Sequence, residues 1–86
     1  MWTVYIIYSR IKDRYYTGFT GDSITERIRK HNTRHSGFTG GGSGDWELQY
    51  SETFTNKEEA SKREREIKSW KSRKKIEKLI GEGHPD

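Results

Sequence analysis

Two short runs of β-branched and aromatic residues near the N-terminus are separated by a polar stretch. The first run covers residues 2–8 and the second covers residues 15–19. Both have the composition of β-strands, and the short polar link between them predicts an antiparallel hairpin. Side chains alternate between the two faces of a strand. We therefore expect one face to carry Trp2, Val4, Ile6 and Tyr8, and the other to carry Thr3, Tyr5 and Ile7.

A helix is predicted directly after this hairpin. Ser23 and Glu26 have the spacing of a capping box, in which the two side chains bind each other's backbone N–H groups. Ile24 and Ile28 are one helical turn apart, so they are expected to face the core together. The helix is expected to end near Asn32.

A glycine-rich segment separates this helix from a third predicted strand. Residues 33–45 hold five glycines between positions 37 and 44, a density that favours a loop. Trp46, Leu48 and Tyr50 then alternate with polar residues, and Phe54 continues the same period. We expect these four apolar side chains to lie on one buried side of the strand.

The C-terminal third of the chain is predicted to be helical and highly charged. Thr55 and Glu58 form a second possible capping box. The pattern over residues 56–80 is compatible with one helix or with two, and Gly81 is a plausible C-cap. The apolar positions of this region are Ala60, Ile67, Trp70, Ile76, Leu79 and Ile80.

Length and composition restrict the classes of protein to consider. A chain of 86 residues forms one domain, which we expect over residues 1–81, with a frayed tail at 82–86. The chain has no cysteine, so disulfides and thiolate metal sites are excluded. It has no apolar run of membrane-spanning length and no signal-peptide pattern. We therefore expect a soluble cytoplasmic protein with no membrane partner.

The positive charge of the chain is unevenly distributed. The net charge is only +4, but residues 57–78 hold ten Lys or Arg against five Glu. Such clusters indicate a polyanionic partner, most commonly nucleic acid, although solvated helix surfaces also collect lysine and arginine. The candidate contacts to DNA are Arg29, Lys30, Arg34, Lys68, Lys71, Arg73 and Lys74.

Glu64 interrupts the apolar pattern of the C-terminal region. It lies four residues after Ala60 and three before Ile67, so a helix places all three on one face. Carboxylates are rarely buried without a partner. Three explanations remain open: a basic side chain pairs with Glu64, a metal ion binds it, or it lies at a rim that reaches water.

Four further residues suit phosphodiester hydrolysis when they are combined with Glu64. Tyr5 and Tyr16 would be near neighbours across the hairpin, and Arg27 and His31 are one helical turn apart. A carboxylate can hold a hard divalent ion, and an arginine stabilises charge on phosphoryl oxygens. A tyrosine, with a pKa of about 10, acts as a base only if its phenolate is stabilised or if a histidine relays the proton.

The order of these residues resembles the GIY-YIG nuclease superfamily, in particular its small stand-alone members of the UvrC-like endonuclease type. The resemblance covers about residues 2–80. Either tyrosine motif alone is weakly specific, but the ordered set is fairly specific. The matching motifs are Thr3-Val4-Tyr5, Tyr16-Thr17-Gly18, Arg27 with His31, and Glu64 within residues 62–70.

The resemblance implies a mixed α/β fold of the α+β class, in which helices flank a three-stranded antiparallel sheet. It also implies a DNA endonuclease with a role in repair or recombination, with one Mg²⁺ or Mn²⁺ held by Glu64 and no other small-molecule cofactor. Tyr5 would be the general base or would position the water. Tyr16 and His31 would orient the nucleophile and the phosphate, and Arg27 would stabilise the transition state.

The sequence also departs from the family pattern. Thr3 replaces the glycine of the first motif, and Phe19 and Thr20 follow Gly18 where repair relatives carry a lysine. Gly18 itself would permit a close approach to the backbone. Two other functions remain open, a non-catalytic nucleic-acid-binding module with the nuclease fold and a protein-interaction domain whose charged helix meets an acidic partner.

Overall fold

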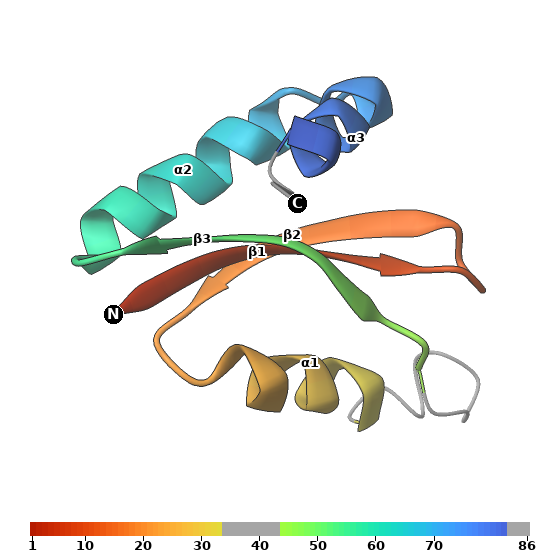
Figure 1. The fold of residues 1–86 in the computed structure, drawn as a ribbon, viewed down its shortest axis with the longest axis horizontal. Helices are drawn as coiled ribbons and strands as arrows, with labels where there is room; N and C mark the ends of the chain where they lie inside the picture. The colour runs from red at the N-terminus through yellow and green to blue at the C-terminus, as the bar shows by residue number, and fades with distance from the viewer. Residues whose placement is uncertain (34–43, 83–86) are drawn as a thin grey trace.

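The computed structural model describes residues 1–33 and 44–82, so most of the predicted glycine-rich loop lies outside the described residues. A three-stranded antiparallel sheet has one helix on one face and two on the other (Figure 1). The α+β fold implied by the resemblance is therefore confirmed. Among the described residues, no helix is both long enough and apolar enough to cross a membrane. In chain order the elements are β1 (Trp2–Ser9), β2 (Arg14–Thr20), α1 (Ile24–Thr33), β3 (Glu47–Phe54), α2 (Lys57–Ser69) and α3 (Arg73–Glu82).

The predicted hairpin forms between β1 and β2, and β1 is the central strand of the order β2-β1-β3. Its turn places Asp13 in the left-handed region, at φ 52°. Aspartate tolerates this conformation better than most residues because its short polar side chain bonds locally. Here the Tyr8 hydroxyl donates to the Asp13 carboxylate at 2.5 Å. The turn is thus closed by a side chain of the strand that leads into it.

The apolar core lies between the sheet and the α2–α3 pair (Figure 1). Its fully buried members are Val4 and Ile6 of β1 and Ala60 and Ile67 of α2. Burial of this kind is the main favourable contribution to folding, and a small domain depends on large side chains to achieve it. The partly buried residues packed around this core are Trp2, Tyr15, Phe19, Tyr50, Phe54, Trp70, Ile76, Leu79 and Ile80.

The prediction that β3 has one uninterrupted buried side is wrong. Ile6 pairs with Tyr50 but Ile7 pairs with Leu48, so β3 has an extra residue at a bulge. A one-residue shift moves every later side chain to the other face of a strand. Tyr50 consequently packs in the core, whereas Leu48 is exposed and Trp46 lies on the α1 face beside Tyr16.

Two helices, rather than one, follow β3. Lys71 has φ 50°, a left-handed conformation, and α2 therefore ends at its C-cap, Trp70. The hydroxyl of Ser72 then accepts the backbone N–H of Lys75 at 3.3 Å, which starts α3. Gly81 lies inside α3, which continues to Glu82, so its prediction as a C-cap is wrong.

The predicted capping box at Ser23 and Glu26 forms only in part, and the prediction of a second box at Thr55 and Glu58 is wrong. Ser23 accepts the backbone N–H of Glu26 at 3.4 Å, but the Glu26 carboxylate turns to Arg29 at 2.7 Å instead of closing the box. At the start of α2 the N-cap is Asn56, not Thr55. The Asn56 side chain accepts the N–H of Glu59 at 2.8 Å.

Replacement of Asn56 by alanine should destabilise the protein through the loss of this cap. The expected decrease in the free energy of unfolding is about 1 kcal/mol. Thr55→Ala is the matched control, because Thr55 precedes the cap and should cost less. Urea denaturation followed by circular dichroism measures both variants, and equal losses would contradict the assignment of Asn56 as the cap.

Candidate active site

The hydroxyl group of Tyr5 is the meeting point of the sheet and α1. Tyr5 is fully buried on the central strand. Arg27 donates from Nε to the Tyr5 oxygen at 3.3 Å, and His31 Nε2 lies 3.2 Å from the same oxygen. Arg27 and His31 reach one atom because they are one turn apart on α1. The structure thus brings together three of the residues singled out by sequence.

The hydrogen-bond chemistry of this group favours a neutral tyrosine. The Tyr5 oxygen accepts a hydrogen bond from the Nε–H group of Arg27. The hydroxyl hydrogen of Tyr5 is therefore available to donate to His31 Nε2 if the imidazole is neutral. Burial raises the pKa of Tyr5 above its usual value of 10.0; the Arg27 hydrogen bond and charge oppose the rise, and Tyr16 and Glu64 add to it. Tyr5 therefore keeps its proton at neutral pH, and its hydroxyl can donate to His31 Nε2 whenever that nitrogen carries no proton.

Gly18 makes room for Tyr5. The two residues are paired across the hairpin, and a Cβ atom on Gly18 would lie 2.6 Å from the Tyr5 hydroxyl oxygen. Real Cβ atoms essentially never approach so closely. The expected close approach at Gly18 is thus made by a phenol ring, which could not lie over the strand beside any larger residue.

Tyr16 extends the site to the edge of the sheet. It pairs with Ile7, so it lies diagonally from Tyr5, and the centroids of the two tyrosine rings are 6.4 Å apart. Its ring centroid is 5.0 Å from that of His31. Tyr16 is 38% exposed, in contrast to the buried Tyr5. It is therefore the tyrosine that a substrate can touch.

Two further residues, Trp46 and Asn32, border the site, although the sequence did not place them there. The rings of Trp46 and Tyr16 have centroids 6.4 Å apart, and those of Trp46 and His31 are 6.3 Å apart. Asn32 fixes Trp46, because its amide donates to the Trp46 carbonyl at 3.1 Å and accepts the Trp46 N–H at 2.8 Å. The bulge in β3 has no signature in the sequence. The only signal for Asn32 was its place next to His31.

Glu64 lies on α2, on the opposite face of the sheet from α1, and its charge contributes to the raised pKa of Tyr5. The helix α2 packs on β1 and β2, and β2 is an edge strand. Lys68 Nζ lies 3.1 Å from Glu64 Oε2 and 5.3 Å from the centroid of the Tyr16 ring. Of the three explanations for Glu64, a basic partner is thus the one observed. Lys68 thus links the Glu64 carboxylate to the Tyr16 ring at the β2 edge.

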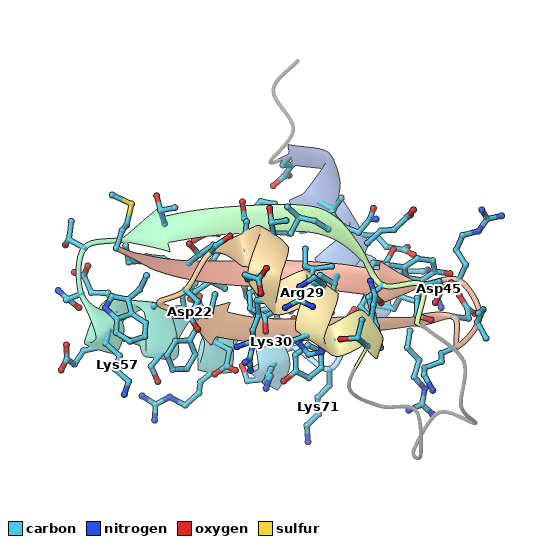
Figure 2. The ribbon with its side chains drawn as sticks, turned by 90° about the horizontal axis from the view of Figure 1, so that it is seen from below. Asp22, Arg29, Lys30, Asp45, Lys57 and Lys71 are labelled. Carbon is cyan, nitrogen blue, oxygen red and sulfur yellow. The ribbon has the colours of Figure 1, made fainter. Side chains whose placement is uncertain are left out.

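The candidate DNA contacts differ in their surroundings. Arg29 forms an exposed pair with Glu26, whereas Arg73 pairs with Asp13 at 2.8 Å and lies over the Tyr8 and Tyr15 rings. Lys71 and Lys74 are exposed, Lys30 is half-buried, and Arg34 lies outside the described residues. Figure 2, viewed from the α1 side, shows Arg29 and Lys30 on α1 and Lys71 extending past the β2 edge.

The residues of the site fit one hard cation with a single carboxylate. Within residues 1–33 and 44–82, no cluster of three or more His, Asp or Glu could hold a metal ion. Mg²⁺ commonly binds through one or two carboxylates and keeps its remaining ligands as water and substrate phosphate. The Lys68 ammonium lies beside Glu64, so the carboxylate is directed towards a position that a positive charge can occupy. Glu64 would hold the ion.

Comparison with known proteins identifies the family of the chain. The model of the GIY-YIG catalytic domain matches residues 1–77, so the chain belongs to the GIY-YIG family. A UPF0213 protein of Staphylococcus saprophyticus is 42% identical over 80 residues, covering 92% of this chain and 95% of the relative. A UPF0213 protein of Staphylococcus epidermidis is 41% identical over 68 residues, covering 79% and 80%. No solved structure matches the chain.

Replacement of Gly18 by alanine should displace Tyr5 and disrupt the site. The added methyl group would overlap the phenol, so we expect a loss of about 1–3 kcal/mol in the free energy of unfolding. Gly81→Ala is the control, because a Cβ atom there meets nothing within 4 Å. A helical alanine should leave stability unchanged or raise it by up to about 1 kcal/mol. Thermal denaturation compares the two, and equal behaviour would contradict the close approach at Gly18.

Proposed function

We propose that this member of the GIY-YIG family is a divalent-metal-dependent endonuclease that hydrolyses phosphodiester bonds in DNA. The observation that carries the proposal is the Tyr5 hydroxyl, hydrogen-bonded to both Arg27 and His31 beside Tyr16 and Glu64. A buried phenol between a fixed cation and an imidazole is poorly explained by packing alone. It is well suited to orienting a water molecule and moving a proton.

In the proposed reaction Tyr5 positions the attacking water molecule, and His31 accepts the proton that this water loses. A water molecule at the exposed Tyr16 side attacks the phosphorus, and its proton passes to the imidazole, directly or through the Tyr5 hydroxyl. The bond between the phosphorus and one deoxyribose oxygen breaks, and the leaving oxygen takes a proton from solvent. The raised pKa of Tyr5 opposes a phenolate base, so the relay to His31 is the favoured form of the mechanism. Tyr16 orients the nucleophile and the phosphate at the open side of the site.

Arg27 stabilises the charge that grows on the phosphoryl oxygens. Its Nε donates to the Tyr5 oxygen, and this hydrogen bond raises the pKa of Arg27. The guanidinium therefore remains positively charged. Because the group is planar and rigid, binding of its Nε also fixes the direction of its other N–H groups. This hydrogen bond thus orients the Arg27 guanidinium as well as the Tyr5 hydroxyl.

Glu64 supplies the carboxylate for the divalent ion, Mg²⁺ or Mn²⁺. When bound, such an ion polarises the phosphate and lowers the pKa of a coordinated water molecule. Glu64 itself is 14% exposed in its side chain, so little competing water surrounds it. This position at the β2 edge would direct the scissile phosphate to the Tyr16 side of the sheet.

The DNA backbone would be held by basic residues around the same edge. Lys30, Lys68, Lys71 and Lys74 are our principal candidates, with Arg29 and Arg34 beside them. Contacts of this kind position the duplex without reading its sequence. Arg73 was also a candidate, but its two ion pairs, to Asp13 and Glu77, favour a structural role.

Glu64→Gln should abolish cleavage and preserve DNA binding. We expect cleavage of plasmid DNA with Mg²⁺ or Mn²⁺ to fall by at least about 100-fold, because a transition-state interaction is lost. Glu58→Gln removes the same charge from an exposed position of α2 and should leave cleavage unchanged. Undiminished cleavage by the Glu64 variant would overturn the metal assignment. Binding without any cleavage by the unaltered protein would favour a non-catalytic DNA-binding module.

The proposed base, His31, accepts a proton only in its neutral form, so the cleavage rate should rise with pH on the acidic side of the profile and then level off. His31→Gln should remove this acidic limb, and Tyr5→Phe should slow cleavage but keep it. A rate that climbs continuously towards pH 10 would instead identify the Tyr5 phenolate as the base.

A further inference from the structure

Lys68 lies between the carboxylate of the site and its exposed tyrosine. It follows Glu64 by one turn of α2, and its Nζ is 3.1 Å from Glu64 Oε2. The same ammonium lies 5.3 Å from the centroid of the Tyr16 ring, within the range of a cation–π contact. The sequence marked Lys68 only as one of several basic residues that could touch DNA. Its position is within the site rather than beside it.

The surroundings of this pair differ from those of an ordinary helical ion pair. Glutamate and lysine four residues apart often pair on exposed helix surfaces. The Arg73–Glu77 pair of α3 is of that kind, with side chains 48% and 46% exposed. In the Glu64–Lys68 pair, by contrast, the lysine is 47% exposed and the glutamate only 14%. A largely enclosed carboxylate is thus paired with a cation whose side chain is about half exposed.

We propose that Lys68 is a built-in competitor of the divalent ion for Glu64, and that the ion displaces the Lys68 ammonium when it binds. This inference rests on the proposed function, because it requires the ion to bind Glu64. In the metal-free protein Lys68 neutralises a carboxylate that would otherwise be poorly solvated. In the metal-bound protein the released ammonium remains beside Tyr16, where it binds a phosphate oxygen of the DNA.

The displacement follows from charge and from the flexibility of lysine. Two cations on one carboxylate oxygen repel each other strongly at a separation of a few ångströms. Lysine is a point charge on a flexible stem, so it can leave its partner at little cost. An arginine at this position would bind both carboxylate oxygens and would be harder to displace. The exchange therefore depends on the residue type as well as on the charge.

The direct test is the affinity of the full chain for Mn²⁺ in the absence of DNA, measured by isothermal titration calorimetry. Lys68→Met should bind Mn²⁺ about two- to tenfold more tightly than the unaltered protein, because an ion pair that opposes binding is removed. Lys68→Arg should bind more weakly than the unaltered protein. A lysine with a purely structural role would give the opposite sign, since its loss would loosen the site and weaken binding.

Lys62→Met is the matched control. Lys62 is exposed on the same helix, and its removal changes the net charge equally. At 3.6 residues per turn it lies on the side of α2 away from Glu64. Its Mn²⁺ affinity should remain within about twofold of the unaltered value. Circular dichroism establishes that all variants are folded before their affinities are compared.

Glu64→Gln separates failure of this inference from failure of the proposed function. If Glu64→Gln abolishes Mn²⁺ binding but Lys68→Met binds no more tightly than the unaltered protein, the competition is refuted and the metal site stands. The same holds if Lys62→Met and Lys68→Met gain affinity equally. If Glu64→Gln and the unaltered protein bind Mn²⁺ alike, both the metal assignment and the competition are refuted.

Discussion

The site depends on the position of one buried hydroxyl group, that of Tyr5. Its ring lies over Gly18 because that residue has no side chain. The hydroxyl then meets Arg27 and His31, which tie α1 to the central strand. A polar group so enclosed is costly to leave without partners. The hydrogen bonds that bring Tyr5, Arg27 and His31 together therefore also hold α1 on the sheet.

Much of the fold was predictable because local patterns and tertiary packing agree. The β-branched and aromatic runs form β1 and β2, and the apolar stripe through Ala60 and Ile67 forms the core side of α2. Glu64 was visible as a carboxylate within that stripe, and its pairing with a basic residue was one of the stated alternatives. The family resemblance, confirmed by the match over residues 1–77, supplied the order of the site residues.

The features that were mispredicted or missed depend on backbone geometry that residue types do not encode. The bulge in β3 reverses the faces of Trp46 and Leu48, and alternation alone cannot reveal a single extra residue. Lys71 breaks the C-terminal helix although lysine is a good helix former, because tertiary packing outweighs a preference of a few tenths of a kcal/mol. Neither Trp46 nor Asn32 could be placed in the site without the bulge.

The position of the site at the edge strand β2 has a consequence for the behaviour of the protein in solution. An open strand edge offers unpaired backbone groups to a second chain, which is a common route to aggregation. The charged and aromatic groups of the site lie around this edge, including the ion pair of Glu64 and Lys68. The residues of the proposed site thus cover this edge, and any self-association through β2 would bury that site and exclude the proposed DNA substrate.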